Sequence, residues 1–141
     1  MNNHIKDYDI SYIQQMFANT PNEDIELDNI FDTHYISIDK SDVGYGREVF
    51  SLSTKLARYL LHNLSHEVPT ENDIKRIIRL KDNLEVNGMK NSWPKKPISI
   101  NKDSLTIEGG IKRLYAIALL TGERTGVMMP MELVETEEEE L

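Results

Sequence analysis

The feature that most limits the fold is a pair of glycines between a predicted strand and a strongly apolar segment. Leu105–Ile107 alternates as a strand does, Gly109–Gly110 interrupts the pattern, and Ile111–Thr121 has the apolar spacing of a buried helix. Pro97–Ile100 before it and Val127–Val134 after it also predict strands. A hairpin, a helix and a further strand in this order predict helices packed on a sheet, which indicates a small mixed α/β domain.

Two helices are predicted upstream of the hairpin. Ser53–Leu64 places leucines at four-residue spacing, which gives one apolar face. Residues Thr70 to Asp73 fit a capping box, in which side chains satisfy the free amides at a helix start, and Gly88 supplies a left-handed stop.

The remaining elements are shorter. The N-terminal third is predicted to hold a short helix, an irregular acidic segment, a strand and a flexible loop, at residues 9–19, 22–32, 35–38 and 42–47. Asn101–Ser104 has turn chemistry, and Pro130 suggests that the last strand lies at a sheet edge. We therefore expect an extension at 1–33, the folded domain at 34–134 and an acidic tail at 135–141.

Composition and charge exclude several classes of protein. The chain of 141 residues has no cysteine, which excludes a disulfide framework, a thiolate metal site and a cysteine nucleophile. It has neither an apolar signal segment nor about 18 consecutive apolar residues, so we expect a cytoplasmic protein that does not insert into membranes. The net charge of −8 divides into −7 for residues 1–50, +4 for 51–134 and −5 for the tail. Acidic flanks repel a long phosphate backbone, so no tight binding to duplex DNA is expected.

The glycine pair has the chemistry of an anion site. Glycines allow a ligand to approach the main chain, and the free amides of a helix start point at it. Lys112 and Arg113, in the first helical turn, add charge-assisted hydrogen bonds, and Arg113 is able to hold a phosphate with two of them. The alternative is that Gly109 and Gly110 form a tight turn and Lys112 is solvated.

The same segment carries a family resemblance. Residues 109–116, Gly-Gly-Ile-Lys-Arg-Leu-Tyr-Ala, resemble the GGCHRY-A motif of sulfiredoxins and the G-x-x-R-x-x-A motif of ParB N-terminal domains. The preceding helix Leu80–Gly88, the strand Pro97–Ile100 and the ending formed by Gly122 and Val127–Leu133 resemble ParB segments in the same order. The similarity covers residues 77–134, and Arg47 matches less closely the arginine after the family's first strand. It implies a ParB/sulfiredoxin-like fold with a phosphate pocket.

The departures from these families concern catalysis. Ile111 stands where sulfiredoxins have their cysteine, so reduction of a cysteine sulfinate is excluded. The ENxxR motif and the DNA-binding domain of ParB have no counterpart. Free serine kinases of the superfamily carry an aspartate where this chain has Gly109, and the acid lies one place earlier, as Glu108. The resemblance thus implies a stand-alone domain that binds a nucleotide or another phosphorylated ligand, with a regulatory role and a phage or plasmid origin.

Two other classes of function remain open. The first is a phosphoryl-transfer enzyme or NTPase, with Glu108 as acid or base and a nucleotide with Mg²⁺ as ligand. In the structural alternative, the Glu108 carboxylate only interacts favourably with the helix dipole. The second class is a non-catalytic module that binds or inhibits a protein partner. The predicted phosphate ligands are Gly109, Gly110, Lys112, Arg113 and Arg47.

Four further residues have both a functional and a structural interpretation. His62 and His66 are four apart and suit a metal if both are helical, although exposed histidines are the simpler expectation. Tyr45 suits base stacking or the anchoring of a loop. Trp93 suits ligand contact or, more simply, packing beside the hairpin.

Overall fold

The structure is a computed structural model that describes residues 13–14, 24–37, 49–87, 97–120 and 127–136. Within them the helices are α3 (Leu27–His34), α5 (Thr54–Asn63), α6 (Glu71–Asn87) and α7 (Ile111–Ala118). The strands are β1 (Tyr35–Ser37), β2 (Val49–Leu52), β3 (Ile98–Asn101), β4 (Thr106–Gly109) and β5 (Val127–Val134). This is the mixed α/β class that the sequence predicts, and no described helix is long and apolar enough to cross a bilayer.

The strands form one sheet in the order β1-β2-β5-β3-β4, with β3 and β5 parallel and the other neighbours antiparallel. The prediction that Pro130 marks a sheet edge is wrong, because β5 is the central strand. Pro130 pairs with Val49 of β2, and pairing with β3 begins only at Met131. A residue without an amide N–H is tolerated there, since the β3 ladder has not yet started.

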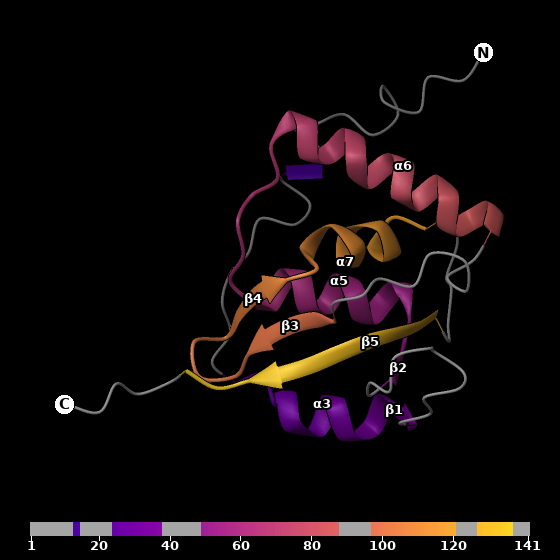
Figure 1. Cartoon of the computed structure of the whole chain (residues 1–141). Coiled ribbons are helices and arrows are strands. Elements are labelled where there is room, and N and C mark those ends of the chain that lie inside the picture. The colour runs from indigo at the N-terminus through magenta and orange to yellow at the C-terminus, as the bar shows by residue number, and fades with distance from the viewer. Residues whose placement is uncertain (1–12, 15–23, 38–48, 88–96, 121–126, 137–141) are drawn as a thin grey trace, which may run out of the picture.

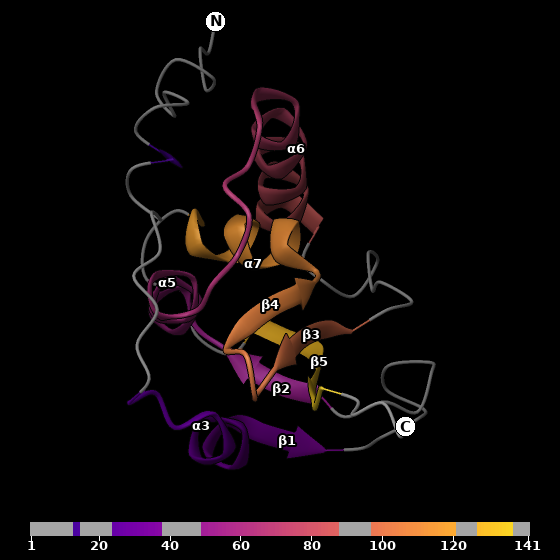
Figure 2. The same ribbon diagram turned by 90° about the vertical axis from the view of Figure 1, so that its left-hand side faces the viewer.

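Helices lie on both sides of the sheet. In Figure 1, α5, α6 and α7 lie on one side and α3 on the other, and Figure 2 shows the same separation from the side. α7 packs against both α5 and α6, which makes it the centre of the larger helical layer. Its residues 114–118 are all buried, as are Leu119 and Leu120 directly after it, which explains why this short segment is so apolar.

The predicted helix starts are confirmed. Ser53 caps α5, since its hydroxyl accepts a hydrogen bond of 2.9 Å from the amide of Leu56. At the start of α6 the amide of Asp73 donates to the Thr70 hydroxyl at 3.2 Å, and the Thr70 amide donates to the Asp73 carboxylate at 3.0 Å. This reciprocal pair is the capping box, with aspartate in the acidic position.

The capping box predicts a pH dependence of stability. The hydrogen bonds from Thr70, followed by the nearby Lys112 ammonium, lower the pKa of the Asp73 carboxyl below 3.8. A lowered folded-state pKa gives stability that is complete above the unfolded pKa, about 4, and is lost as the pH falls through the folded value. Asp73→Asn is therefore expected to lower the urea midpoint at pH 7, with the difference from the natural protein shrinking towards pH 2. A difference that stays constant over this range would contradict the prediction.

The N-terminal part of the chain contributes to the same core. The expectation of irregular structure at 22–32 is wrong from residue 27 onward, where α3 begins and buries Leu27 and Phe31. Phe31 packs edge-to-face on Phe50 of β2 with ring centroids 4.8 Å apart. Ile13, from the predicted 9–19 helix, is helical and fully buried. α3 also crosses the predicted domain boundary at 33/34, and the division into extension, domain and tail stays a prediction.

Candidate functional site

The glycine break before α7 is built for close packing. Gly110 precedes the helix in the left-handed conformation, with φ 77° and ψ 18°. A Cβ atom on it would lie 2.8 Å from Cγ1 and 2.9 Å from Cα of Ile98 on β3. Gly109 is different, because a Cβ there would meet only the Cβ of Ser99, at 3.7 Å. Only the second glycine is therefore required by the fold.

Arg113 lies over this break. The same imaginary Cβ on Gly110 would be 3.0 Å from Nη2 of Arg113, so the guanidinium covers the face that glycine leaves open. The other nitrogen, Nη1, lies 3.8 Å from Sδ of Met129 on β5, a weak hydrogen-bond contact. The structure thus brings Gly110 and Arg113, two of the predicted phosphate ligands, close together.

Lys112 points towards the start of another helix. Its Nζ lies 3.5 Å from Oδ1 of Asp73, and both side chains are about one-third to two-fifths exposed. The first turns of α6 and α7 therefore meet through an ion pair. Lys112 is neither the freely solvated cation of the simpler interpretation nor an unshared phosphate ligand, because a phosphate at α7 would compete with Asp73.

The first turn of α7 has no side-chain cap. Gly110 offers no capping group, and its carbonyl accepts from the amides of Arg113 at 3.1 Å and Leu114 at 3.2 Å. The amides of Ile111 and Lys112 precede these bonded positions, as the free amides of a helix start do. Such amides suit an anion, and the helix dipole has the sign that attracts one.

Glu108 belongs to a different network. β4 carries one extra residue there, because Ile107 pairs with Ile100 while Gly109 pairs with Ser99. The Glu108 carboxylate accepts a hydrogen bond of 3.3 Å from Nδ2 of Asn101. A bulge of this kind redirects a side chain.

Asn101 was not anticipated as a central residue, although its turn was. It is 5% exposed, and its Oδ1 accepts from the amides of Asp103 at 2.9 Å and Ser104 at 3.0 Å. Its Nδ2 also donates to the hydroxyl of Thr136 at 3.2 Å. Asn101 thus ties the β3–β4 turn to Glu108 and to the end of β5. The Asn-x-x-Ser spacing reveals the turn, but nothing local reveals the two distant partners.

A hollow of about 510 Å³, here called the edge hollow, lies beside Glu108. It is lined by Ser65, His66, Glu67, Thr106, Ile107, Glu108 and Ile111. Neither Lys112 nor Arg113 is among its lining residues. The predicted catalytic acid thus lines a hollow to which the two predicted cationic ligands do not contribute.

His66 does not form a metal site with His62. It follows the end of α5, and its ring nitrogens lie 2.8 Å from the carbonyl oxygen of Leu61 and 3.0 Å from that of Glu67. Its ring also packs edge-to-face on Tyr115, whose burial raises the pKa of the phenol. Both nitrogens therefore face main-chain carbonyl oxygens, which gives His66 a structural role. No group of three or more potential metal ligands occurs among the described residues.

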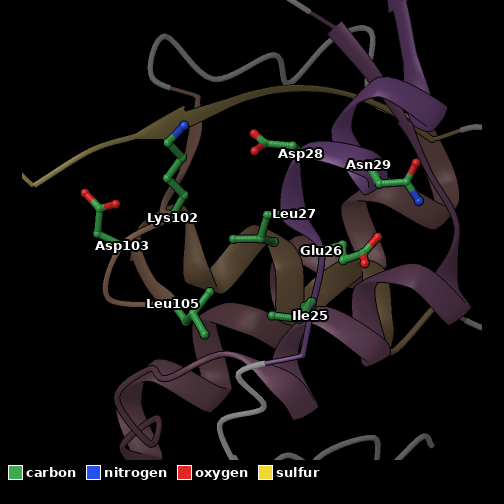
Figure 3. A pocket seen from close by; sticks show the side chains of 8 residues that line it. All are labelled: Ile25, Glu26, Leu27, Asp28, Asn29, Lys102, Asp103 and Leu105. Carbon is green, nitrogen blue, oxygen red and sulfur yellow. The ribbon is translucent and has the colours of Figure 1, made fainter.

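A second hollow, also of about 510 Å³, lies between the start of α3 and the β3–β4 turn (Figure 3). Figure 3 shows its apolar side, with Ile25, Leu27 and Leu105, and its charged side, with Lys102 facing Asp28. The ammonium of Lys102 already pairs with Glu135 at 3.0 Å. The hydrogen bond that Lys102 donates to the Glu135 carboxylate, helped by the nearby charge of Asp28, raises the pKa of Lys102. The one lysine of this lining is thus already paired, and the acids Glu26, Asp28 and Asp103 leave the hollow with an excess of negative charge.

Comparisons with protein-family models, with curated proteins and with solved structures each find no match to this chain. Function is therefore argued from the site itself. Three predicted functional residues, Arg47, Tyr45 and Trp93, lie outside the described residues.

Proposed function

We propose that this protein binds a phosphorylated small molecule, a nucleotide in the first place, at the first turn of α7. One observation carries the proposal: the guanidinium of Arg113 covers Gly110 where α7 starts without a side-chain cap. A phosphate placed there would meet the free amides, the helix dipole and a bidentate donor together. Lys112 would join by exchanging Asp73 for the ligand. Arg47 is a further proposed ligand of the phosphate, from the family resemblance.

The position of Glu108, the only acid beside the glycine pair, favours binding over catalysis. Phosphoryl transfer requires an acid or base on the nucleophile and a metal held near the phosphates. Glu108 instead accepts a hydrogen bond from Asn101 and lines the edge hollow, whose lining includes neither Lys112 nor Arg113. Asp73, the carboxylate that pairs with Lys112, is engaged in the capping box. We therefore propose a binding module of ParB/sulfiredoxin-like fold with a regulatory role. A nucleotide would bring any Mg²⁺ with it.

The proposal predicts that Arg113 controls affinity. Nucleoside mono-, di- and triphosphates, with and without Mg²⁺, are screened by thermal shift, and the best ligand is titrated calorimetrically. Arg113→Ala is expected to weaken this ligand about tenfold or more, since a charge-assisted pair is lost. Arg113→Lys should recover part of the affinity, because it keeps the charge without the bidentate geometry. Arg79→Ala, which removes an exposed arginine of α6, is the matched control.

Two results would contradict the binding site. One is unchanged affinity in Arg113→Ala, and the other is the absence of any stabilising phosphorylated compound. The enzyme alternative has its own test in Glu108→Gln, which keeps the size of the side chain and removes its charge. Loss of nucleotide turnover in that variant, with affinity retained, would replace the binding role by phosphoryl transfer.

A further inference from the structure

The outer edge of β4 is only partly covered. β4 is the last strand of the sheet, and residues 65–67, here called the strap, meet it at Ser65. Ser65 alone of the described residues pairs with this edge: its amide donates to the Leu105 carbonyl at 2.8 Å, and its carbonyl accepts from Ile107 at 2.9 Å. Beyond Ile107 no described strand continues the pairing. Open backbone of this kind is a template for another strand.

The strap is held away from the rest of the edge. The ring nitrogens of His66 lie 2.8 Å from the carbonyl oxygen of Leu61 and 3.0 Å from that of Glu67, and the ring packs edge-to-face on Tyr115 with centroids 5.6 Å apart. These contacts turn the chain off β4 immediately after Ser65. The edge hollow, of about 510 Å³, opens where the strap departs. Fixed side-chain contacts therefore maintain the opening.

The negative charge of the edge hollow favours a basic ligand. Glu67 and Glu108 are both exposed and both line it, and its lining contains no lysine or arginine. Ile107, which is buried, and Ile111, which is partly buried, supply an apolar wall. An extended peptide that alternates apolar and basic residues complements this surface, because one face meets the isoleucines and the cations meet the carboxylates.

We infer that the edge hollow receives a basic, extended segment of a partner protein, which adds a strand beside β4 beyond Ser65. Main-chain hydrogen bonds supply the affinity of such strand addition, and the alternating side chains supply its specificity. A phosphopeptide or another anionic segment is disfavoured by the two carboxylates. The inference does not depend on phosphate binding at α7, because it uses neither Lys112 nor Arg113.

The test uses the full chain and three peptides. The probe is acetyl-Lys-Val-Lys-Val-Lys-Val-amide, the charge control replaces each lysine by glutamate, and the backbone control carries N-methyl groups on the valines. Amide NMR shifts and hydrogen exchange are recorded for residues 65–67 and 106–109. The basic peptide is expected to shift these amides and to slow their exchange. The acidic peptide should do neither, and N-methylation should weaken binding about tenfold or more.

Variants separate strand addition from general attraction. Glu67→Lys reverses an exposed charge of the edge hollow and is expected to weaken the basic peptide about tenfold, whereas Glu71→Lys, on α6 outside the edge hollow, should leave it nearly unchanged. Equal binding of the N-methylated peptide would overturn the inference, because attraction without strand pairing would explain it. Shifts at residues 25–29 instead of 106–109, or no shifts at all, would overturn it as well.

Discussion

Gly110→Ala is expected to destabilise the protein by about 2–5 kcal/mol, enough to unfold many domains of this size. Two independent costs add. A left-handed conformation costs a residue with a side chain about 1–2 kcal/mol, and Gly110 has φ 77°. The new Cβ would also press on the main chain of Ile98, at 2.9 Å from its Cα. Backbone in the middle of a sheet does not move aside as a flexible side chain does, so overpacking adds to the conformational strain.

The adjacent glycine is the matched control. Gly109→Ala places its methyl at an ordinary van der Waals distance, 3.7 Å from Cβ of Ser99, and Gly109 has no positive φ. Its effect is expected to stay within about 1 kcal/mol, the range of unstrained changes at exposed or half-buried positions. Urea denaturation of the two variants measures the contrast. Equal losses of stability would show that the two glycines share one role, contrary to the geometry.

Where local signals and tertiary packing agree, the fold is predictable from the sequence. Three elements carry a local signal that agrees with their packing, namely a capping residue, a turn or an apolar periodicity. They are α5, α6 and the β3–β4 hairpin. α3 and β2 carry no such signal. α3 has only eight residues and starts in an acidic stretch, and it becomes helical where Leu27 and Phe31 are buried. β2 has four residues, too few for a period-two pattern to stand out.

The position of Pro130 shows what local chemistry does not contain. A missing amide N–H predicts an edge strand, yet β5 lies in the centre of the sheet. Pro130 is accommodated there because it pairs with β2, whereas pairing with β3 begins one residue later. The strand order, and the point where pairing with β3 starts, result from contacts between segments distant in sequence. The sequence of residues 97–134 predicts its own strands and helix, but it does not predict that β2 pairs with β5.

The candidate site was predictable in the same partial way. The approach of Arg113 to Gly110 follows from their spacing across the first helical turn. The partner of Lys112 does not, because Asp73 lies on another helix, 39 positions earlier in the numbering of the chain. Glu108 belongs to the motif in sequence but leaves it in space, since the bulge directs it towards Asn101. Placing a carboxylate in a motif therefore does not place it beside the ligand.

Asn101→Ala is expected to lower the free energy of unfolding by about 2–4 kcal/mol, because this one buried side chain satisfies several polar groups. The amides of Asp103 and Ser104 lose their acceptor, and the turn between β3 and β4 loses its fixed shape. Thr136, two residues after the end of β5, loses the bond that ties it to β3. The resulting loss should appear as a lower urea midpoint with an unchanged slope.

The matched control for Asn101 is Asn72→Ala, which removes an exposed asparagine in the first turn of α6. That change is expected to stay within about 0.5 kcal/mol, as surface substitutions do. Hydrogen exchange adds a local readout, since loss of Asn101 should speed the exchange of the Asp103 and Ser104 amides before the rest of the sheet. If both asparagines proved equally dispensable, the turn would be held by its backbone alone. Glu108 would then owe its direction to the bulge and not to its hydrogen bond with Asn101.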